Sequence, residues 1–348
     1  MVRMFKLEDR SAEFHRKNKT VDLVKRIGVI TADRVYLTNY PVNNPVMVFN
    51  PSICIENDDL KIYGRMVLGY FTYASAVLEL IVPIGELEEI SGGHYSGRIV
   101  VKPDNKYDIW GVEDPRVCII NGKEIMTYCG RTVNYFSSAK ITERTVPVIA
   151  VKEKGKEKKK QGWIKTGVFR MLGGKIVSDK DAFLVEMNGL KLFHRIHTLD
   201  NEFYCIISDV ERTVLERDEF KEIEVSDAII ALKAAKFEEK IGWGSPPVKI
   251  RNEYLMLVHA IDRETKWYKI FAVLMDENAK VTAVTPYYIM EPKENYEVYG
   301  DRPFTVFPCG MCRLDDKLLI SYGAADSAAG IGEIDLIRLM EILDSNRI

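Results

Sequence analysis

Short runs of β-branched and aromatic residues alternate with turn residues along most of this chain. Such runs, alternating between apolar and polar positions, are typical of strands. They number about sixteen, which is more than one open sheet usually holds. We predict strands at Val29–Thr31, Arg34–Leu37, Leu60–Phe71, Ser75–Val82, Ser96–Val101, Arg116–Ile120, Glu124–Cys129, Val146–Val151, Ala182–Glu186, Leu190–Arg195, Tyr204–Ile207, Val248–Ile250, Tyr254–Ala260, Tyr268–Leu274, Thr305–Arg313 and Lys317–Tyr322.

Tight-turn residues join several of these runs into hairpins. The turn sequences are Asn121-Gly122, Asn188-Gly189, Arg251-Asn252 and Asp315-Asp316. Evenly spaced antiparallel strands favour small sheets repeated around a central axis, an arrangement in which each sheet has only short, protected edge strands. Although 348 residues would ordinarily suggest two domains, all-β chains of this length often form one. The pattern predicts an all-β fold, a single five-bladed β-propeller over residues 1–348.

Helical periodicity is sparse. Apolar residues recur at helical spacing in two segments, Asp227–Lys240 and Asp335–Leu343, and a helix is predicted in each. The second is expected to be a short C-terminal helix that seals the last blade.

Composition narrows the function without identifying it. The chain is 47% hydrophobic and 29% charged with a formal net charge of −2, which indicates a globular protein and gives no electrostatic reason to expect nucleic acid. The lysine-rich run Lys152–Lys160 is interpreted as an exposed hairpin tip. No apolar run reaches a membrane span, and the charged N-terminal segment lacks a signal-peptide core. We therefore expect a cytoplasmic protein with no membrane partner.

Six cysteines are scattered along the chain, a pattern that argues for reduced thiols. Cys309 and Cys312 have the spacing of a redox motif or half a zinc site. No second pair accompanies them, so two packed thiols beside a turn are the simpler interpretation. No metal site is predicted.

The chemically most suggestive segment is Tyr107–Val117, which places Glu113, Asp114 and Arg116 around a proline at the start of a strand. One interpretation is an acidic turn paired with Arg116. The other is a carboxylate presented for catalysis at a rim. The residues alone leave both open.

Gly111-Val-Glu-Asp-Pro-Arg116, followed by Met126-Thr-Tyr128, resembles the signature of glycoside hydrolase family 130, the mannoside phosphorylases and related hydrolases. The resemblance covers about residues 45–345. Further landmarks in the family's order are Asn50-Pro51 with Arg65, Lys180-Asp-Ala-Phe183, Leu192-Phe-His-Arg195, Ile241–Pro247, Leu257-Val-His259, Val306–Gly310 and Tyr322-Gly-Ala-Ala-Asp326.

The resemblance implies a five-bladed propeller and an inverting phosphorolysis. A β-mannoside and inorganic phosphate would give α-mannose 1-phosphate and a shortened acceptor, with Asp114 as general acid acting through a hydroxyl of the bound mannose. Phosphate is already anionic, so no second carboxylate base is required. Phosphate is the co-substrate, and no cofactor is predicted.

Phosphate next to an acid needs charge-assisted donors. The resemblance suggests four phosphate-binding residues: Arg131, Arg144, Lys180 and His194. Arg170 competes with Arg144, because the chain from Lys152 to Lys175 does not align securely with the family. Arg116 is interpreted as an ion-pair partner of Glu113 or Asp114.

Mannose binding calls for side chains that donate and accept hydrogen bonds. The substrate-binding residues suggested by the resemblance are Asn50, Arg65, His259, Asp262 and Asp326. His259 is equally well explained as a core histidine. Tyr299–Arg302 is expected to form a rim loop without an assigned role.

Three alternatives remain. A β-mannoside hydrolase of the same family would need a carboxylate to activate water. A non-catalytic carbohydrate-binding propeller or protein scaffold would not need Asp114, and a furanosidase-type propeller enzyme would lack the Glu113–Arg116 landmark. Family members assemble as homo-oligomers, so the resemblance leaves both a monomer and a homo-oligomer open for this protein.

Overall fold

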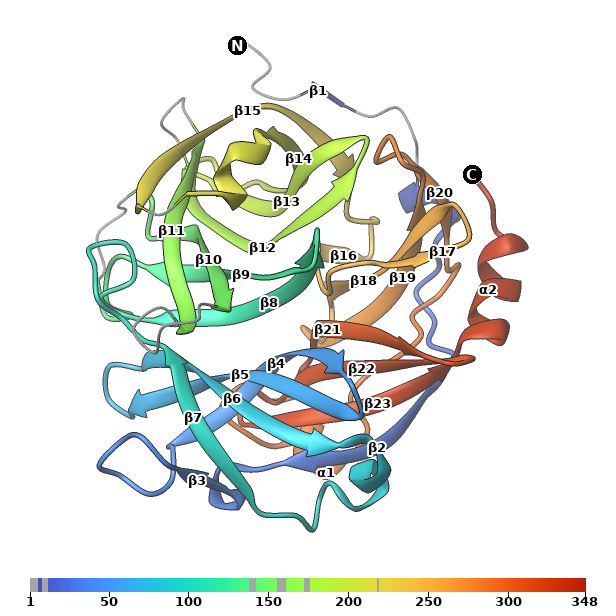
Figure 1. Ribbon diagram of the computed structural model, residues 1–348. Helices are drawn as coiled ribbons and strands as arrows, with labels where there is room; N and C mark the ends of the chain where they lie inside the picture. The colour runs from blue at the N-terminus through green and yellow to red at the C-terminus, as the bar shows by residue number, and fades with distance from the viewer. Residues whose placement is uncertain (1–5, 8–11, 138–141, 155–160, 172–175, 218) are drawn as a thin grey trace.

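Antiparallel strands build almost the whole protein, as the sequence predicts. The computed structural model describes residues 6–7, 12–137, 142–154, 161–171, 176–217 and 219–348. Every predicted strand segment overlaps an observed strand. In Figure 1, strands β4, β8, β12, β16 and β21 lie nearest the middle of the molecule, and their partners lie further out.

The strands pair mostly with neighbours in sequence. The first sheet has the order β3-β7-β6-β5-β4. Its strands are β3 (Val35–Leu37), β4 (Met47–Glu56), β5 (Asp59–Gly69), β6 (Ala74–Pro83) and β7 (Tyr95–Val101).

A nine-stranded sheet follows, made of two antiparallel groups that touch through β10–β12 and β11–β15 pairs. The first group contains β8 (Val112–Ile120), β9 (Lys123–Arg131), β10 (Thr145–Lys154) and β11 (Gln161–Met171). The second contains β12 (Ile176–Met187), β13 (Gly189–Thr198), β14 (Phe203–Val210) and β15 (Lys221–Leu232), with β1 (Lys6–Leu7) at its edge.

Two further sheets complete the fold. One contains β16 (Glu238–Trp243), β17 (Val248–Ile250), β18 (Glu253–Asp262), β19 (Tyr268–Met275) and β20 (Val281–Val284). The other has β21 (Val306–Leu314), β22 (Lys317–Ala324) and β23 (Ala328–Asp335), and β2 (Val24–Ile30) pairs with β23. The early strand β2 and the last strand β23 therefore lie side by side in one sheet.

Helices are few in the described residues. Besides 3-10 turns at Ala12–His15, Ala32–Arg34, Ile84–Glu89 and Arg212–Leu215, there are α1 (Asn295–Val298) and α2 (Leu336–Asp344). The prediction of α2 is confirmed: the Asp335 side chain accepts from the Arg338 N–H, and Leu336, Leu339, Met340 and Leu343 are buried. None of these helices has the length and hydrophobicity that a membrane span requires.

The predicted helix at Asp227–Lys240 is wrong. The segment contains the end of β15, a turn and the start of β16. Two strands on either side of a turn happened to place apolar residues at helical spacing, and their backbone groups pair with β14 and β18 instead. Long-range pairing outweighed the local pattern.

Two of the strands that the sequence analysis missed, β4 and β23, are buried on both faces along most of their length. In β4 the seven residues Val48–Cys54 are all buried, so no alternation marks the strand.

The predicted turns are confirmed: Asn121 and Gly122 both have positive φ, 52° and 74°, as the two central residues of a type I′ hairpin require. The run Lys152–Lys160 falls partly outside the described residues, between β10 and β11.

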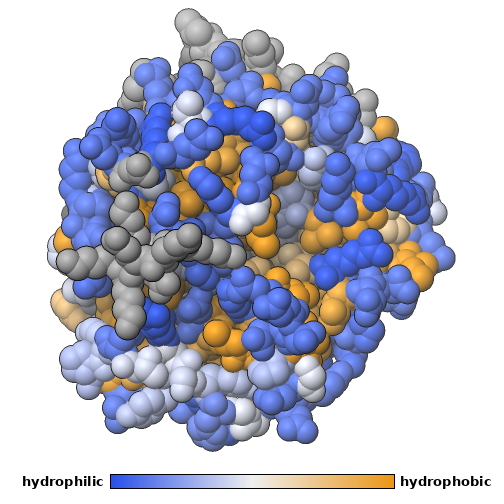
Figure 2. Space-filling view, viewed as in Figure 1, coloured by the Kyte–Doolittle hydropathy of each residue, from blue (hydrophilic) through white to orange (hydrophobic). Residues whose placement is uncertain are grey.

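Hydrophobic side chains fill the space within and between these sheets. On the face seen in Figure 2, hydrophilic residues dominate the outline and hydrophobic ones lie mainly toward the middle. The cysteines in the described residues are free thiols, and Cys309 is buried in β21 while Cys312 is partly exposed.

Candidate active site

A cavity of about 600 Å³ opens where the five innermost strands meet. Each of these strands contributes at least one lining residue: Asn50 from β4, Asp114 from β8, Lys180 from β12, Lys240 from β16 and Phe307 from β21. Residues far apart in sequence therefore converge on one hollow.

Backbone bulges direct three of the polar side chains toward the cavity. The strand register shifts at Phe49/Ser52 in β4, at Glu113/Arg116 in β8 and at Lys180/Phe183 in β12. At these points Asn50, Asp114 and Asp181 adopt φ of 48°, 49° and 55°. Asn and Asp tolerate this left-handed conformation better than other side chains with a Cβ.

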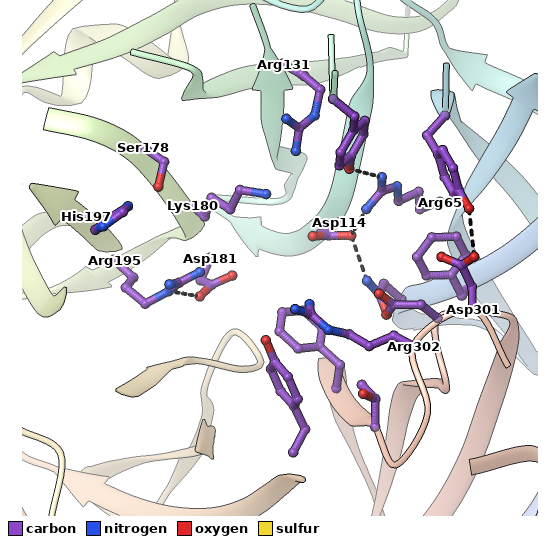
Figure 3. A pocket seen from close by; sticks show the side chains of 18 of the residues that line it. Arg65, Asp114, Arg131, Ser178, Lys180, Asp181, Arg195, His197, Asp301 and Arg302 are labelled. Carbon is purple, nitrogen blue, oxygen red and sulfur yellow. Dashed lines mark hydrogen bonds and ion pairs between the residues drawn. The ribbon is translucent and has the colours of Figure 1, made fainter. Parts of the chain in front are cut away.

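Asp114 is held by two donors on one oxygen. Its Oδ1 accepts from Asn50 Nδ2 at 2.8 Å and from Arg65 Nη1 at 3.2 Å. No described residue donates to its Oδ2. The carboxyl group is oriented but keeps an oxygen that is able to carry a proton toward a ligand (Figure 3).

Glu113, the next residue back, is fully buried and gathers the surrounding cations. Its carboxylate lies 2.6 Å from Arg131 Nε, 3.1 Å from Arg65 Nη2 and 3.2 Å from Lys180 Nζ. The Tyr135 hydroxyl donates to it at 2.6 Å. Burial alone would raise the pKa of Glu113, but the charges of Arg131, Arg65 and Lys180 hold it well below its usual range.

Asp181 forms a second ionic cluster. It accepts from Arg195 Nε at 2.5 Å, and Arg116 and His259 each lie 3.5 Å away. Burial opposes ionisation of Asp181, but Arg195, His259 and Arg116 lower its pKa.

The interpretation of Arg116 as a partner of the Glu113 or Asp114 carboxylate is therefore wrong. Its guanidinium donates to the carbonyls of Asp114, Trp243 and Gly244 and ties β8 to β16.

Basic side chains outnumber acids around the cavity. Six basic residues line it, Arg65, Arg131, Lys180, Arg195, Lys240 and Arg302, against four carboxylates, Asp114, Asp181, Asp301 and Asp326. In the described part of the chain, Lys240 and Arg302 have no carboxylate within ion-pair distance. Burial, together with nearby Arg195 and Arg302, lowers the pKa of Lys240 to about 8.

Asp326 lies on the turn between β22 and β23. Burial, reinforced by the Asp114 and Asp301 carboxylates, raises its pKa to about 6, although Arg302 and Arg65 oppose the shift. Asp326 is therefore protonated more readily than Asp181 on the same cavity wall.

The structure brings six of the predicted site residues to the cavity: Asn50, Arg65, Asp114, Arg131, Lys180 and Asp326. Four others do not line it. Arg144 donates to the Ser137 carbonyl, and Arg170, its competitor, pairs with Glu143 and Glu222.

The other three of these four residues, two histidines and an aspartate, likewise lie outside the cavity lining. His194 is buried between Asp179 and Ser208, and Asp262 accepts from the backbone N–H groups of Glu264 and Thr265 in a turn. His259 packs behind the cavity wall against Asp181 and Phe307, and burial together with Arg195 and Arg116 lowers its pKa to about 3 despite Asp181.

Several lining residues had no assigned role in the sequence analysis. Arg195 stands beside His194 in a landmark, and Asp301 with Arg302 belongs to the predicted rim loop. Strand alternation determines which of two neighbours faces inward: Arg195 and His197 line the cavity and His194 does not. Tyr73, Tyr135 and Phe136 come from loops with no motif signal. Among the described residues, no group of three or more His, Cys, Asp or Glu side chains is arranged to hold a metal ion.

Known proteins are similar to this chain over most of its length. A family described as beta-1,4-mannooligosaccharide phosphorylase matches residues 14–345. A beta-1,2-mannobiose phosphorylase of Thermoanaerobacter sp. (strain X514) is 25% identical over 322 residues, which are 86% of this chain and 96% of the relative.

A 1,2-beta-oligomannan phosphorylase of the same organism is 25% identical over 240 residues, covering 68% of this chain and 72% of the relative. Among solved structures, the beta-1,2-mannobiose phosphorylase of Listeria innocua in complex with beta-1,2-mannobiose is similar. It has a TM-score of 0.67 at 17% identity and covers 93% of this chain and 97% of that one. At this identity the likeness establishes a shared fold.

Proposed function

Because the chain belongs to glycoside hydrolase family 130, we propose that it is a mannoside phosphorylase that cleaves β-mannosides by inverting phosphorolysis with Asp114 as the general acid. One observation carries the proposal: Asp114 lies in a cavity where basic residues exceed carboxylates. An excess of cations suits a dianionic co-substrate, and the Asp114 carboxyl group, whose Oδ2 accepts from no described residue, suits protonation of a leaving oxygen.

In the proposed reaction, a phosphate oxygen attacks the anomeric carbon while the bond from that carbon to the acceptor oxygen breaks. Asp114 supplies the proton to the acceptor oxygen, through a mannose hydroxyl as the family resemblance implies. Monohydrogen phosphate brings the proton that restores Asp114. The products are α-mannose 1-phosphate and the shortened acceptor, and no step uses a cofactor or metal.

Arg131 and Lys180 are the proposed phosphate ligands from the sequence analysis that also line the cavity. Both share Glu113 with Arg65, so this carboxylate neutralises only part of their charge. Arg195 and Lys240 extend the basic surface beyond Lys180. Asn50, Arg65 and Asp326 remain the proposed mannose ligands.

We propose that the fold is a closed, single-domain, five-bladed propeller. Five groups of mainly antiparallel strands follow one another along the chain, and one strand of each, β4, β8, β12, β16 or β21, contributes to the cavity wall. Pairing of β2 with β23 would close the ring.

A β-mannoside hydrolase is the second candidate. Asp326 favours it, because a carboxylate on the same cavity wall with a pKa raised to about 6 has the character of a base that activates water. Phosphate dependence separates the two functions.

The test uses β-1,2- and β-1,4-linked mannobiose with and without inorganic phosphate, and measures mannose 1-phosphate and free mannose. We expect phosphate-dependent sugar phosphate from the native protein and a loss of about 10²–10⁴-fold in Asp114→Asn. Asp316→Asn, a substitution at an exposed turn between β21 and β22, should keep full activity. Equal mannose release without phosphate would establish the hydrolase instead.

A further inference from the structure

Five aromatic rings meet beside the cavity. Tyr70, Phe71 and Tyr73 come from the β5–β6 turn, and Tyr135 and Phe136 follow β9. Phe71 stacks on Phe136 with ring centroids 5.0 Å apart, Tyr73 lies 5.6 Å from Tyr135, and Tyr70 lies 6.0 Å from Tyr73. These five residues are called the aromatic ledge.

The ledge exposes large apolar surfaces. Phe71 is 76% exposed, Tyr70 66% and Phe136 62%. Single exposed aromatics are ordinary, but a contiguous group at the edge of a cavity is typical of a binding site. Flat aromatic faces suit the C–H faces of pyranose rings, and they lose little conformational freedom on binding.

The ledge continues the cavity wall. Tyr73, Tyr135 and Phe136 line the cavity, and Phe71 and Tyr70 extend the surface outward from them. Hydrogen bonds fix the inner rings: the Tyr73 hydroxyl donates to Asp301 at 2.7 Å, and the Tyr135 hydroxyl contacts Arg65 at 2.8 Å. The outer rings have no hydrogen bond in the described residues.

The ledge also has a defined place relative to the reacting groups. Figure 3 shows Asp114 between two ends of the cavity, with Lys180, Arg195 and His197 at one end and Arg65 and Asp301 at the other. The ledge joins the Arg65 and Asp301 end through its tyrosine hydroxyls. In an inverting displacement, nucleophile and leaving group lie on opposite faces of the anomeric carbon.

If phosphate occupies the Lys180 end, the leaving saccharide extends toward the opposite end. We infer that the aromatic ledge binds the acceptor part of the saccharide chain, and that the enzyme prefers manno-oligosaccharides longer than a disaccharide. This inference rests on the proposed phosphorolysis. The inner rings would contact the first acceptor sugar, and Phe71 and Tyr70 the sugars beyond it.

The test compares kcat/KM for manno-oligosaccharides of increasing length, from disaccharide to tetrasaccharide, at saturating phosphate. Phe71 does not line the cavity, so Phe71→Ala should lower kcat/KM for the tetrasaccharide more than kcat/KM for the disaccharide. Its preference for the tetrasaccharide over the disaccharide should fall about five- to tenfold, the scale of one lost aromatic contact. Phe71→Tyr should restore the preference.

Tyr36→Ala is the matched control, because Tyr36 is 54% exposed on β3 and belongs to neither the ledge nor the cavity. It should leave the length profile unchanged. An unaltered length profile in Phe71→Ala would overturn the inference while leaving phosphorolysis intact. Absence of any phosphate-dependent turnover by the native protein would instead refute the proposed function.

Discussion

Asn50, Asp114 and Asp181 adopt the same left-handed backbone conformation, each at a register shift in an innermost strand and each on the cavity wall. A bulge turns a side chain that would otherwise follow the regular alternation of the strand. The repeated use of Asn or Asp at these points is therefore a requirement of the backbone as well as of the chemistry. Replacement by a β-branched residue would combine strain with loss of the polar group.

Lys180 is expected to act on phosphate and Arg170 is not. Lys180 lines the cavity beside Glu113, whereas Arg170 pairs with Glu143 and Glu222 away from it. Lys180→Ala should raise the KM for phosphate by about 10–100-fold through loss of a charge-assisted contact, with a smaller effect on the KM for the mannoside. Arg170→Ala should leave both constants unchanged. Phosphate titrations at fixed mannoside measure this, and equal effects of the two variants would contradict the assignment.

At the scale of elements, Glu113 connects four strands. It lies on β8 and pairs with Arg65 of β5, Arg131 of β9 and Lys180 of β12. The buried carboxylate thereby holds the basic residues in fixed positions around Asp114. Arg116 has a similar role between β8 and β16, where its donors satisfy three carbonyl groups.

Glu113→Gln should destabilise the protein by about 3 kcal/mol, because it leaves several buried cations without their shared counter-charge. Urea unfolding at pH 7 measures the change. Glu88→Gln is the control: the Glu88 side chain is 72% exposed and pairs with Lys25 on the surface, so its loss should cost less than about 1 kcal/mol. A similar loss in both variants would show that the Glu113 cluster is not important for stability.

At the scale of the whole molecule, the buried ionic groups behind the cavity make stability depend on pH. Burial together with Arg195 and Arg116 lowers the pKa of His259 to about 3, against the pull of Asp181. The His259 imidazole therefore becomes protonated below about pH 6.5 in the unfolded chain, but only below about pH 3 in the folded protein. The stability that His259 contributes is complete above pH 6.5 and decreases as the pH falls through this window.

His259→Gln should reduce this dependence, by at most about 1.4 kcal/mol per pH unit for a single proton. The free energy of urea unfolding, measured from pH 7 down to pH 4, should decline less steeply in the variant than in the native protein. Asp181 and Glu113 have lowered pKa values, so part of the acid sensitivity should persist. Identical slopes would mean that His259 titrates normally in the folded protein.

Local sequence was sufficient for much of this protein. Strand segments, hairpin turns such as Asn121-Gly122 and the helix α2 follow from side-chain alternation, turn conformations and capping, which involve only neighbouring residues. The Glu113–Arg116 motif pointed to Asp114 before any geometry was known. Strands buried on both faces, and the strand–turn–strand segment mistaken for a helix, lacked a distinguishing local pattern.

Only the tertiary structure decided which side chains share the cavity. Arg195 faces it while its neighbour His194 contacts Asp179 and Ser208, and a one-residue change of strand face separates the two. The pairing of Glu113 with three cations and the assembly of the aromatic ledge join residues from different sheets and loops. Such contacts depend on how strands distant in sequence pack together, and the local sequence does not determine that packing.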